Sequence, residues 1–312
     1  MTEGHGGHPS VGVVIPTHSR PELLRAALDA VLAQDYPGEL RVAVVFDRAE
    51  PDPSLADVPG ADGRVTVLAN DRTPGLAGAR NTGILALDTE LVAFCDDDDA
   101  WLPEKLTAQT AALVGRPDAV LASCGILVRF RGDDNARLAG SAEVTHADLI
   151  RSRMVMVHSS TYLARRAALT GPDGIGLVDE TIPAGQNEDW DFALRAARRH
   201  PIVNVDRPLV RVLWGRTSLF AGEYDTKIEG LRWMLANHPE LAADPVGSAR
   251  VYGQIAFWNA GLGRRREALS WVGRAMRANW RERRVPFALA VASGLVSDER
   301  VLRTLHAKGH GI

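Results

Sequence analysis

The chain of 312 residues is poor in cysteine, lacks long apolar runs and carries little net charge. Its two cysteines, Cys95 and Cys124, cannot form a disulfide framework, and both lie in apolar segments. We therefore expect reduced core residues in a cytoplasmic protein. The longest near-continuous apolar run covers residues 285–296, which is shorter than the roughly 20 residues of a membrane-spanning helix. Lys and Arg number 36 against 39 Asp and Glu, a balance that gives no electrostatic footprint for nucleic acid.

The remaining composition is that of a soluble globular protein. Hydrophobic residues make up 46% of the chain and charged residues 24%, which excludes wholesale disorder and collagen. The length is that of one large or two modest domains. Residues 1–9 contain no apolar core of a signal peptide, so we expect a flexible N-terminal tail.

The first part of the chain alternates between short apolar runs and segments with helical spacing. The apolar runs at 11–15, 42–46, 65–68 and 91–95 predict strands, and the segments 21–33, 78–87 and 103–113 predict helices. This alternation predicts an α/β fold with a mostly parallel sheet flanked by helices. Because such sheets bind ligands at the carboxyl ends of their strands, the loops that follow the strands are the places to look for chemistry.

Four consecutive carboxylates, Asp96 to Asp99, directly follow the fourth predicted strand. Such groups repel one another and raise each other's pKa, and a hard divalent cation removes that penalty. In an extended stretch Asp96 and Asp98 point the same way, so these two are the predicted metal ligands. The alternative is a solvated acidic loop in which one Asp caps the next helix. The position at the presumed binding edge favours the metal site.

Three further loops reach the same edge of the sheet. Pro16–Arg20 follows the first strand, and Asp47 follows the second, where it is either a turn residue or an acceptor for a nucleobase. Gly75 and Gly78 open a helix, and they either permit a tight turn or allow the helix start, with Arg80, to hold a diphosphate.

A fifth polar segment lies downstream, at residues 186–191, before a helical stripe. Asn187 is a candidate N-cap, and acids in a first helical turn complement the helix dipole. The same dipole keeps Asp189 ionised, which suits a general base.

The order and spacing of these segments resemble family 2 glycosyltransferases with the GT-A fold, over roughly residues 10–218. The matching stretches are VVIPTHSR (13–20), Asp47, GLAGARN (75–81), FCDDDDAWLPEKL (94–106) and NEDWD (187–191). Each stretch alone is weak, but the ordered set is specific.

The resemblance implies inverting transfer of a sugar from a nucleotide-diphosphate donor to a hydroxyl. It implies Mn²⁺ or Mg²⁺ at Asp96 and Asp98, and a catalytic Glu188–Asp189 pair with Asp189 as the base. It further implies a nucleotide-sugar site that comprises Pro16, Thr17, Arg20, Asp47, Gly75, Arg80, Asp96 and Asp97.

Two departures from that family pattern stand out. The second strand ends in Phe46-Asp47-Arg48, with one acid where relatives usually have two. Many relatives also place a His near the metal in the loop that corresponds to residues 211–218, and none occurs there in this chain. Arg216 of that loop either neutralises the leaving diphosphate or is a solvated loop residue.

Residues 219–312 have a different, helical character. A stripe near Ile228 and two helical segments at 249–261 and 266–280, joined by Gly-Leu-Gly, predict a helical domain with a tetratricopeptide-like hairpin. Trp271, Trp280 and the basic run Arg281–Arg284, followed by residues 285–296, suit either contact with a membrane surface or a buried C-terminal helix after a solvated loop. We favour the buried helix, and at most peripheral membrane contact.

Two other function classes stay open on the sequence alone. A sugar-nucleotide nucleotidyltransferase would share the sheet and the metal carboxylates, but it should carry a Gly-rich loop after the first strand, and residues 16–20 contain no Gly. The second is a non-catalytic interaction module that uses the helical domain. The expected partners are the nucleotide-sugar donor and a small-molecule, glycan or lipid-linked acceptor.

Overall fold

The computed structural model describes residues 8–130, 133–213, 223–307 and 312. The chain forms two compact units. The first comprises Met1–His146, Met154–Glu180 and Glu188–Trp214, and the second comprises Ala147–Arg153, Thr181–Asn187 and Gly215–Ile312. Two short segments of the region predicted as catalytic therefore belong to the helical unit. The predicted boundary between residues 218 and 219 lies outside the described residues.

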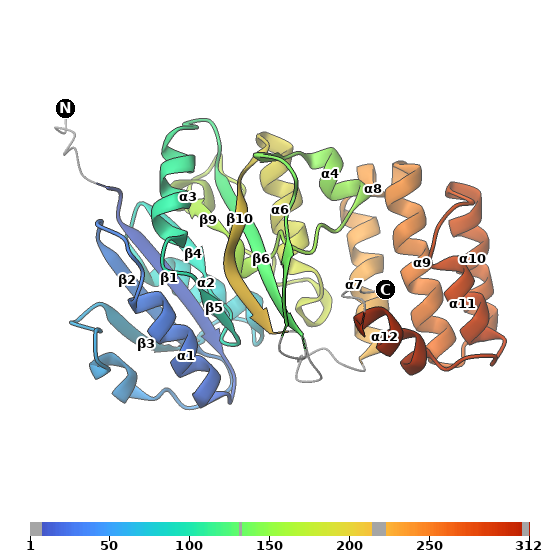
Figure 1. Cartoon of the computed structure of the whole chain (residues 1–312), viewed down its shortest axis with the longest axis horizontal. Helices are drawn as coiled ribbons and strands as arrows, with labels where there is room; N and C mark the ends of the chain where they lie inside the picture. The colour runs from blue at the N-terminus through green and yellow to red at the C-terminus, as the bar shows by residue number, and fades with distance from the viewer. Residues whose placement is uncertain (1–7, 131–132, 214–222, 308–311) are drawn as a thin grey trace. The chain divides into compact units, whose positions relative to one another are not determined.

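Within the described ranges, the first unit is built on a ten-stranded mixed sheet (Figure 1). Its strands are β1 (Val11–Thr17), β2 (Leu40–Phe46), β3 (Val65–Ala69), β4 (Leu91–Phe94), β5 (Asp99–Trp101), β6 (Leu121–Phe130), β7 (Asp133–Arg137), β8 (Glu143–Val144), β9 (Leu163–Arg165) and β10 (Ile202–Leu213). Hydrogen-bonded neighbours follow the order β3-β2-β1-β4-β9-β6-β10-β5, with β7 beside β6 and β8 beside β10.

The first half of the sheet is parallel, as the alternation of strands and helices predicts. β1 lies between β2 and β4, and β3 pairs with β2, all in parallel register, so their carboxyl ends meet at one edge. The second half is mixed, because β9 is antiparallel to β4 and to β6, and β5 is antiparallel to β10. Only residues 95–98 separate β4 from β5, too few for a parallel crossover, and β5 pairs with β10 instead.

The helices of the first unit include α1 (Pro21–Leu32), α2 (Leu76–Ala86), α3 (Lys105–Val114), α5 (Arg166–Thr170) and α6 (Glu188–Arg199), with short 3-10 turns η1 (Pro53–Asp57) and η2 (Ser159–Thr161). The short helix α4 (His146–Arg151) begins at the end of one segment of this unit. The sequence predicted that α3 starts at Pro103. In the structure α3 begins at Lys105, so Pro103 precedes the helix.

Helices cover both faces of the sheet, because successive side chains of a strand point to opposite faces. Val13 of β1 lies in the core cluster that contains Leu28 of α1 and Leu106 of α3. Val14 faces the other way, against Gly83 of α2, where an added Cβ would lie 2.4 Å from Val14 Cγ1. The predicted α/β class with flanking helices is therefore confirmed.

In its described residues, the second unit consists of helices. After α4, most of which belongs here, come the 3-10 turn η3 (Pro183–Gly185), α7 (Tyr224–Asn237), α8 (Pro239–Ala243), α9 (Pro245–Gly261), α10 (Arg265–Ala278), α11 (Val285–Ala292) and α12 (Asp298–Ala307). α9 packs against α7, α10 and α11, and the small side chains of Ala268 and Ala275 are fully buried in α10. None of the helices in the described ranges has the length and apolar character needed to cross a membrane.

Candidate active site

Asp96, Asp97 and Asp98 lie in the connection between β4 and β5, at the carboxyl end of the parallel strands, and Asp99 is the first residue of β5. The first member of this acidic run, Asp96, is held by three groups. The N–H of Asp96 donates to Ser160 Oγ (2.9 Å), Ser159 Oγ donates to Asp96 Oδ2 (2.7 Å), and Arg80 Nη2 donates to Asp96 Oδ1 (2.6 Å). Burial opposes ionisation of Asp96, but the Arg80 charge and the Ser159 hydroxyl outweigh it and lower the pKa of this carboxyl. Asp96 is therefore an ionised, fixed carboxylate.

The next two acids connect the acidic run to the loop after β1. Asp97 Oδ2 accepts a hydrogen bond from Thr17 Oγ1 (2.8 Å). Arg20 Nη1 lies 3.4 Å from Asp97 Oδ1 and 2.7 Å from Asp98 Oδ2. Burial raises the pKa of Asp97 to about 6, and burial together with the charge of Asp96 raises the pKa of Asp98. Four predicted site residues thus lie together, and Arg20 offsets part of the negative charge.

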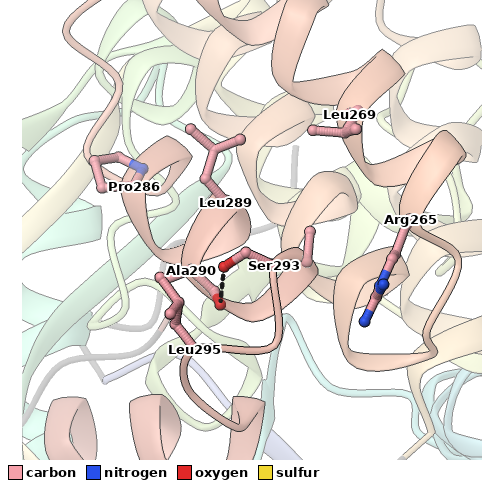
Figure 2. Close-up of a pocket in the computed structure, with 8 residues that line it drawn as sticks. Arg265, Leu269, Pro286, Leu289, Ala290, Ser293 and Leu295 are labelled. Carbon is pink, nitrogen blue, oxygen red and sulfur yellow. Dashed lines mark hydrogen bonds between the residues drawn. The ribbon is translucent and has the colours of Figure 1, made fainter.

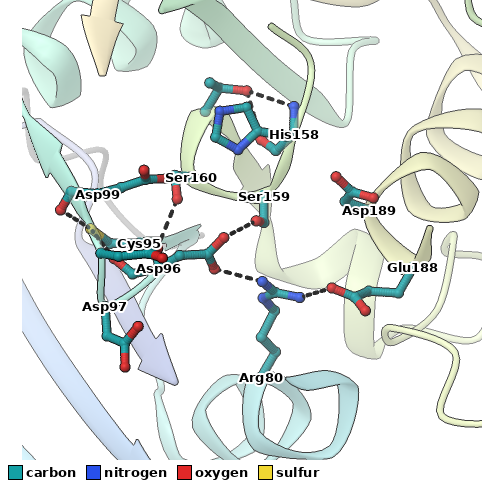
Figure 3. A network of polar contacts seen from close by, with 12 residues as sticks. Arg80, Cys95, Asp96, Asp97, Asp99, His158, Ser159, Ser160, Glu188 and Asp189 are labelled. Atoms are coloured by element: carbon teal, nitrogen blue, oxygen red, sulfur yellow. Dashed lines mark hydrogen bonds and ion pairs between the residues drawn. The ribbon is translucent and has the colours of Figure 1, made fainter. Parts of the chain in front are cut away.

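Arg80 joins the acidic run to the start of α6 (Figure 3). Its side chain is 2% exposed, and its guanidinium donates one hydrogen bond to Asp96 and another, through Nη1, to Glu188 Oε1. Both contacts are charge-assisted, with a buried carboxyl at Glu188 and a partly exposed one at Asp96, and such contacts fix geometry strongly. The arrangement favours a positioning role for Arg80 over the predicted contact with a diphosphate.

One arginine in this network contacts two acidic side chains, of which Glu188 is buried and Asp96 is partly exposed. Burial opposes the charge of Arg80, but Asp96 and Glu188 outweigh it, so the pKa of the guanidinium is raised. Burial raises the pKa of Glu188 to about 7 against the attraction of Arg80, and the charge of Asp189 contributes to the increase. Because Asp96 stays ionised, Glu188 is the member of the network that takes up a proton near neutral pH.

Asp96 also belongs to a group of side chains with the chemistry of a cation site. One potential ligand atom each of Asp96, Asp99 and His158 lies within 4.8 Å of the others (Figure 3). Asp99 is buried, and burial together with the charge of Asp96 raises its pKa well above the usual range. The backbone at His158 is fixed by Thr161, whose Oγ1 donates to the His158 carbonyl (2.7 Å) and accepts from the His158 N–H (3.3 Å). Two carboxylates and an imidazole at this spacing could hold a divalent cation.

Asp189 lies in the first turn of α6, beside Glu188. Its Oδ1 accepts the Trp190 N–H (2.8 Å), and its carbonyl accepts the hydroxyl of Tyr162 (3.0 Å). Asp189, Glu188 and Arg80 line one small cavity. The predicted base is therefore anchored at its backbone and borders the same space as the Arg80 network.

The other polar residues at the start of α6 have different surroundings. Asp191 is buried, and its Oδ2 accepts a hydrogen bond from Arg195 Nε at 2.9 Å. Asn187, the predicted N-cap, has a φ of 70°, which differs from the extended conformation usual for that position. Asp191 thus shares the helix turn with Asp189 but has a structural ion pair of its own.

Asp47, the residue after β2, organises a neighbouring loop. Its Oδ1 accepts hydrogen bonds from Asn70 Nδ2 (2.8 Å) and the Gly75 N–H (2.9 Å), and its Oδ2 accepts one from Arg48 Nε (2.9 Å). Burial opposes ionisation, but these donors outweigh it and lower the pKa of Asp47. The contacts favour the loop-organising interpretation of Asp47 over a direct contact with a nucleobase.

The Gly75–Gly78 spacing also has a structural reason. Gly75 has a φ of 122°, a conformation that favours glycine, and it caps the start of α2. A Cβ added to Gly78 would lie 1.9 Å from the Thr73 carbonyl oxygen. Both glycines are thus required by the turn.

The structure brings most of the predicted residues together in the Arg80 network and in the loop after β1, which the acidic run connects. It adds one residue that sequence reasoning missed. Arg80, Asp96, Glu188 and Asp189 lie around one network, and the loop after β1 joins it through the acidic run. Pro16 is a buried residue of β1. His158 is the missed residue, and its signal is the polar run His158-Ser159-Ser160-Thr161 just before β9. The loop that contains Arg216 lies outside the described residues.

Several glycosyltransferases are similar to this chain in sequence. It is 28% identical over 104 residues to the Escherichia coli UDP-Glc:alpha-D-GlcNAc-diphosphoundecaprenol beta-1,3-glucosyltransferase WfgD. This alignment covers 33% of this chain and 41% of that protein. It is 28% identical over 274 residues to a pre-mycofactocin glycosyltransferase of Mycobacterium tuberculosis, which covers 82% of this chain and 54% of that protein. The chain thus spans about half or less of the length of these relatives.

Solved glycosyltransferase structures share the fold. S. aureus TarS 1-349 in complex with UDP-GlcNAc has a TM-score of 0.62 at 18% identity, over 96% of this chain and 92% of that one. The mannosyltransferase PcManGT from Pyrobaculum calidifontis, in complex with GDP-Man and Mn²⁺, has a TM-score of 0.52 at 18% identity, over 94% of this chain and 84% of that one. The predicted GT-A fold is confirmed. A model of the family described as Glycosyl transferase family 2 matches residues 12–169, which is half of the chain, and this chain belongs to that family.

Proposed function

We propose that this chain transfers a sugar from a nucleoside-diphosphate donor to an acceptor hydroxyl, with inversion at the anomeric carbon. The observation that carries the proposal is the Arg80 network, which ties the acidic run at the carboxyl end of β4 to the Glu188–Asp189 pair. The network supports a donor site and a base at one place in the fold. The complexes of TarS with UDP and UDP-GlcNAc, and of PcManGT with GDP-Man, support the donor class.

A divalent cation fits the side chains at the acidic run. Asp96 and Asp99 offer carboxylate oxygens and His158 offers an imidazole nitrogen, a set that suits Mn²⁺, and the charge repulsion on Asp99 is what a cation would relieve. Once bound, the cation would act as a Lewis acid that stabilises the negative charge on the leaving nucleoside diphosphate. We propose Asp96, Asp99 and His158 as its protein ligands. Asp98 is less favoured than the sequence suggested, because Arg20 pairs with it.

Asp189 is the proposed general base. Its carboxylate can accept the proton of the acceptor hydroxyl as that oxygen attacks the anomeric carbon. A single displacement of this kind requires one base and no covalent sugar–enzyme intermediate. Glu188 is a weaker candidate, because its carboxylate is already bonded to Arg80.

The acceptor we propose is a hydroxyl of a glycan, and in particular of a lipid-linked glycan. WfgD, by its name, transfers glucose to a GlcNAc-diphosphoundecaprenol, which supports this class. The donor sugar and nucleobase are best identified by screening.

The test combines ligand binding with product analysis. We expect UDP or GDP together with Mn²⁺ to raise the melting temperature by roughly 5–10 °C, since a ligand at 100 times its Kd stabilises by about 2.7 kcal/mol. Neither component alone should do so, and EDTA should reverse the shift. Turnover with the matching nucleotide sugar and an acceptor should release a nucleoside diphosphate and a product of inverted configuration.

Three outcomes would contradict all or part of the proposal. Release of pyrophosphate from a nucleoside triphosphate and a sugar 1-phosphate would identify a nucleotidyltransferase. No thermal shift and no hydrolysis across the common nucleotide sugars would favour a binding module. Retention of configuration in the product would refute the single displacement alone.

A further inference from the structure

The helical unit contains an open groove between α10 and α11, with a volume of about 560 Å³ (Figure 2). Leu269 of α10 lies on one side, and Pro286 and Leu289 of α11 lie on the other, with Ser293 and Leu295 just beyond the end of α11. Its lining is almost entirely apolar, and the guanidinium of Arg265 adds charge at one end. The groove plays no part in the site described above.

Several large apolar side chains of the same segment are strongly exposed. Leu295 is 82% exposed, Trp280 71%, Leu269 53% and Met276 49%. Leu269 and Met276 are seven residues apart on α10, so they lie along one side of that helix. The predicted burial of residues 285–296 holds for the inner side of α11, at Val285, Ala288 and Val291, but its outer side is open. The apolar side chains that line the groove form one patch, and such patches mark interaction sites more often than singly exposed residues do.

The same segment carries a concentrated positive charge. Residues 262–297 contain eight arginines and two glutamates, a net charge of +6, whereas the whole chain carries −3. The rest of the chain therefore carries −9. Among the described residues, no carboxylate forms an ion pair with Arg265, Arg266, Arg277 or Arg283. The charge of these four side chains is thus available to an external partner.

We propose that the outer side of α10 and α11 docks on an anionic lipid bilayer surface. Exposed Leu and Trp side chains beside arginines are the composition of helices that lie in the membrane interface. Arginine binds phosphate through two parallel N–H donors, and each basic side chain near an anionic surface strengthens binding about fivefold. An anionic surface attracts only this segment, because the rest of the chain carries a net charge of −9 and is repelled by it.

A second copy of this chain suits the surface less well. Self-association through this side would bring two segments of +6 together, which disfavours a symmetric dimer. The cores of protein interfaces are also depleted in charge, whereas here Arg265 lines the groove together with the apolar side chains. An anionic bilayer offers phosphates to the arginines and an apolar interior to the leucines.

The experiment is vesicle flotation with the full chain, without donor or metal, so its outcome is independent of the proposed glycosyl transfer. We expect binding to vesicles of equal parts phosphatidylglycerol and phosphatidylcholine, weakened by salt, and little binding to phosphatidylcholine alone. The double variant Arg265→Gln and Arg283→Gln should reduce the partition coefficient roughly 25-fold. The double variant Leu269→Gln and Leu289→Gln should reduce it roughly tenfold or more.

Val114→Gln is the matched control, since Val114 is an exposed apolar residue of α3 in the other unit and should leave binding unchanged. The exposed positions of all four substituted residues should preserve melting temperature. Equal binding to neutral and anionic vesicles, or unchanged binding in both double variants, would overturn the proposal. A concentration-dependent dimer that the leucine variant abolishes, without vesicle binding, would assign the surface to self-association.

Discussion

Replacement of Asp189 by Asn separates catalysis from helix stability at the start of α6. The substitution is nearly isosteric and keeps an oxygen that can accept the Trp190 N–H, which lies 2.8 Å from the carboxylate. It removes one of three acids in the first turn of α6, and the loss of one such charge costs about 0.3–1 kcal/mol of stability. Folding should therefore change little.

The effect on turnover should be much larger. An amide oxygen is not an effective proton acceptor, so the rate should fall by roughly 10²–10⁴, which corresponds to about 3–5 kcal/mol on the activation barrier. The assay is initial rate on a true acceptor at saturating donor and Mn²⁺, corrected for the folded fraction. Donor affinity should be nearly unchanged, because the proposed donor-binding groups belong to the acidic run and the loop after β1.

Asp191→Asn is the matched control. It removes the same charge from the same helix turn, but its carboxylate bonds Arg195 at 2.9 Å. It should lower stability and leave turnover per folded molecule intact. If Asp189→Asn keeps turnover within a few-fold of the parent, the assignment of the base is refuted, and Glu188 becomes the next candidate.

Two further predictions address the metal and the buried network. In calorimetry, His158→Gln should weaken Mn²⁺ affinity by about tenfold or more, whereas Asp98→Asn should change it only a few-fold. The reverse ranking would favour Asp96 and Asp98 as the metal ligands, as the sequence predicted. Burial raises the pKa of Glu188 to about 7, above its ordinary 4.5, so the folded state binds more protons between these values and this carboxyl costs stability as pH rises through that window. Glu188→Gln should remove a cost on the order of 3 kcal/mol. In urea unfolding, the free energy of unfolding of the variant should rise relative to that of the parent between pH 5 and pH 8. A relative decrease over this range would show that the folded state prefers the ionised form of Glu188.

The parallel half of the fold was predictable because its signals are local. The runs that form β1, β2, β3 and β4 are short and apolar, and the helix of residues 21–32 shows a clear apolar stripe. β5 and β9 were missed because each is three residues long, and their pairing with β10 and β4 joins segments more than sixty residues apart. No periodicity develops over so few residues.

The two loops preceding α2 and η2 show why a site can be only partly derived from sequence. Asp47 and Gly75 follow different strands, and nothing in their spacing indicates that the Gly75 N–H bonds the Asp47 carboxylate. His158 lies more than fifty residues from Asp96 in the chain, so its place beside the acidic run depends on β9 pairing with β4.

Arg80 is the residue at which this limit matters most for mechanism. Sequence context places it in the first helical turns after a glycine loop, where a cation suits a diphosphate. Its burial instead makes it the counter-ion of Asp96 and Glu188, two acids that lie 92 residues apart. Since an unpaired buried charge is costly, removal of this arginine would leave both carboxylates uncompensated and raise their pKa values together. One side chain thereby couples the ionisation of the proposed metal ligand Asp96 to that of Glu188 beside the base, a coupling that motif spacing alone does not reveal.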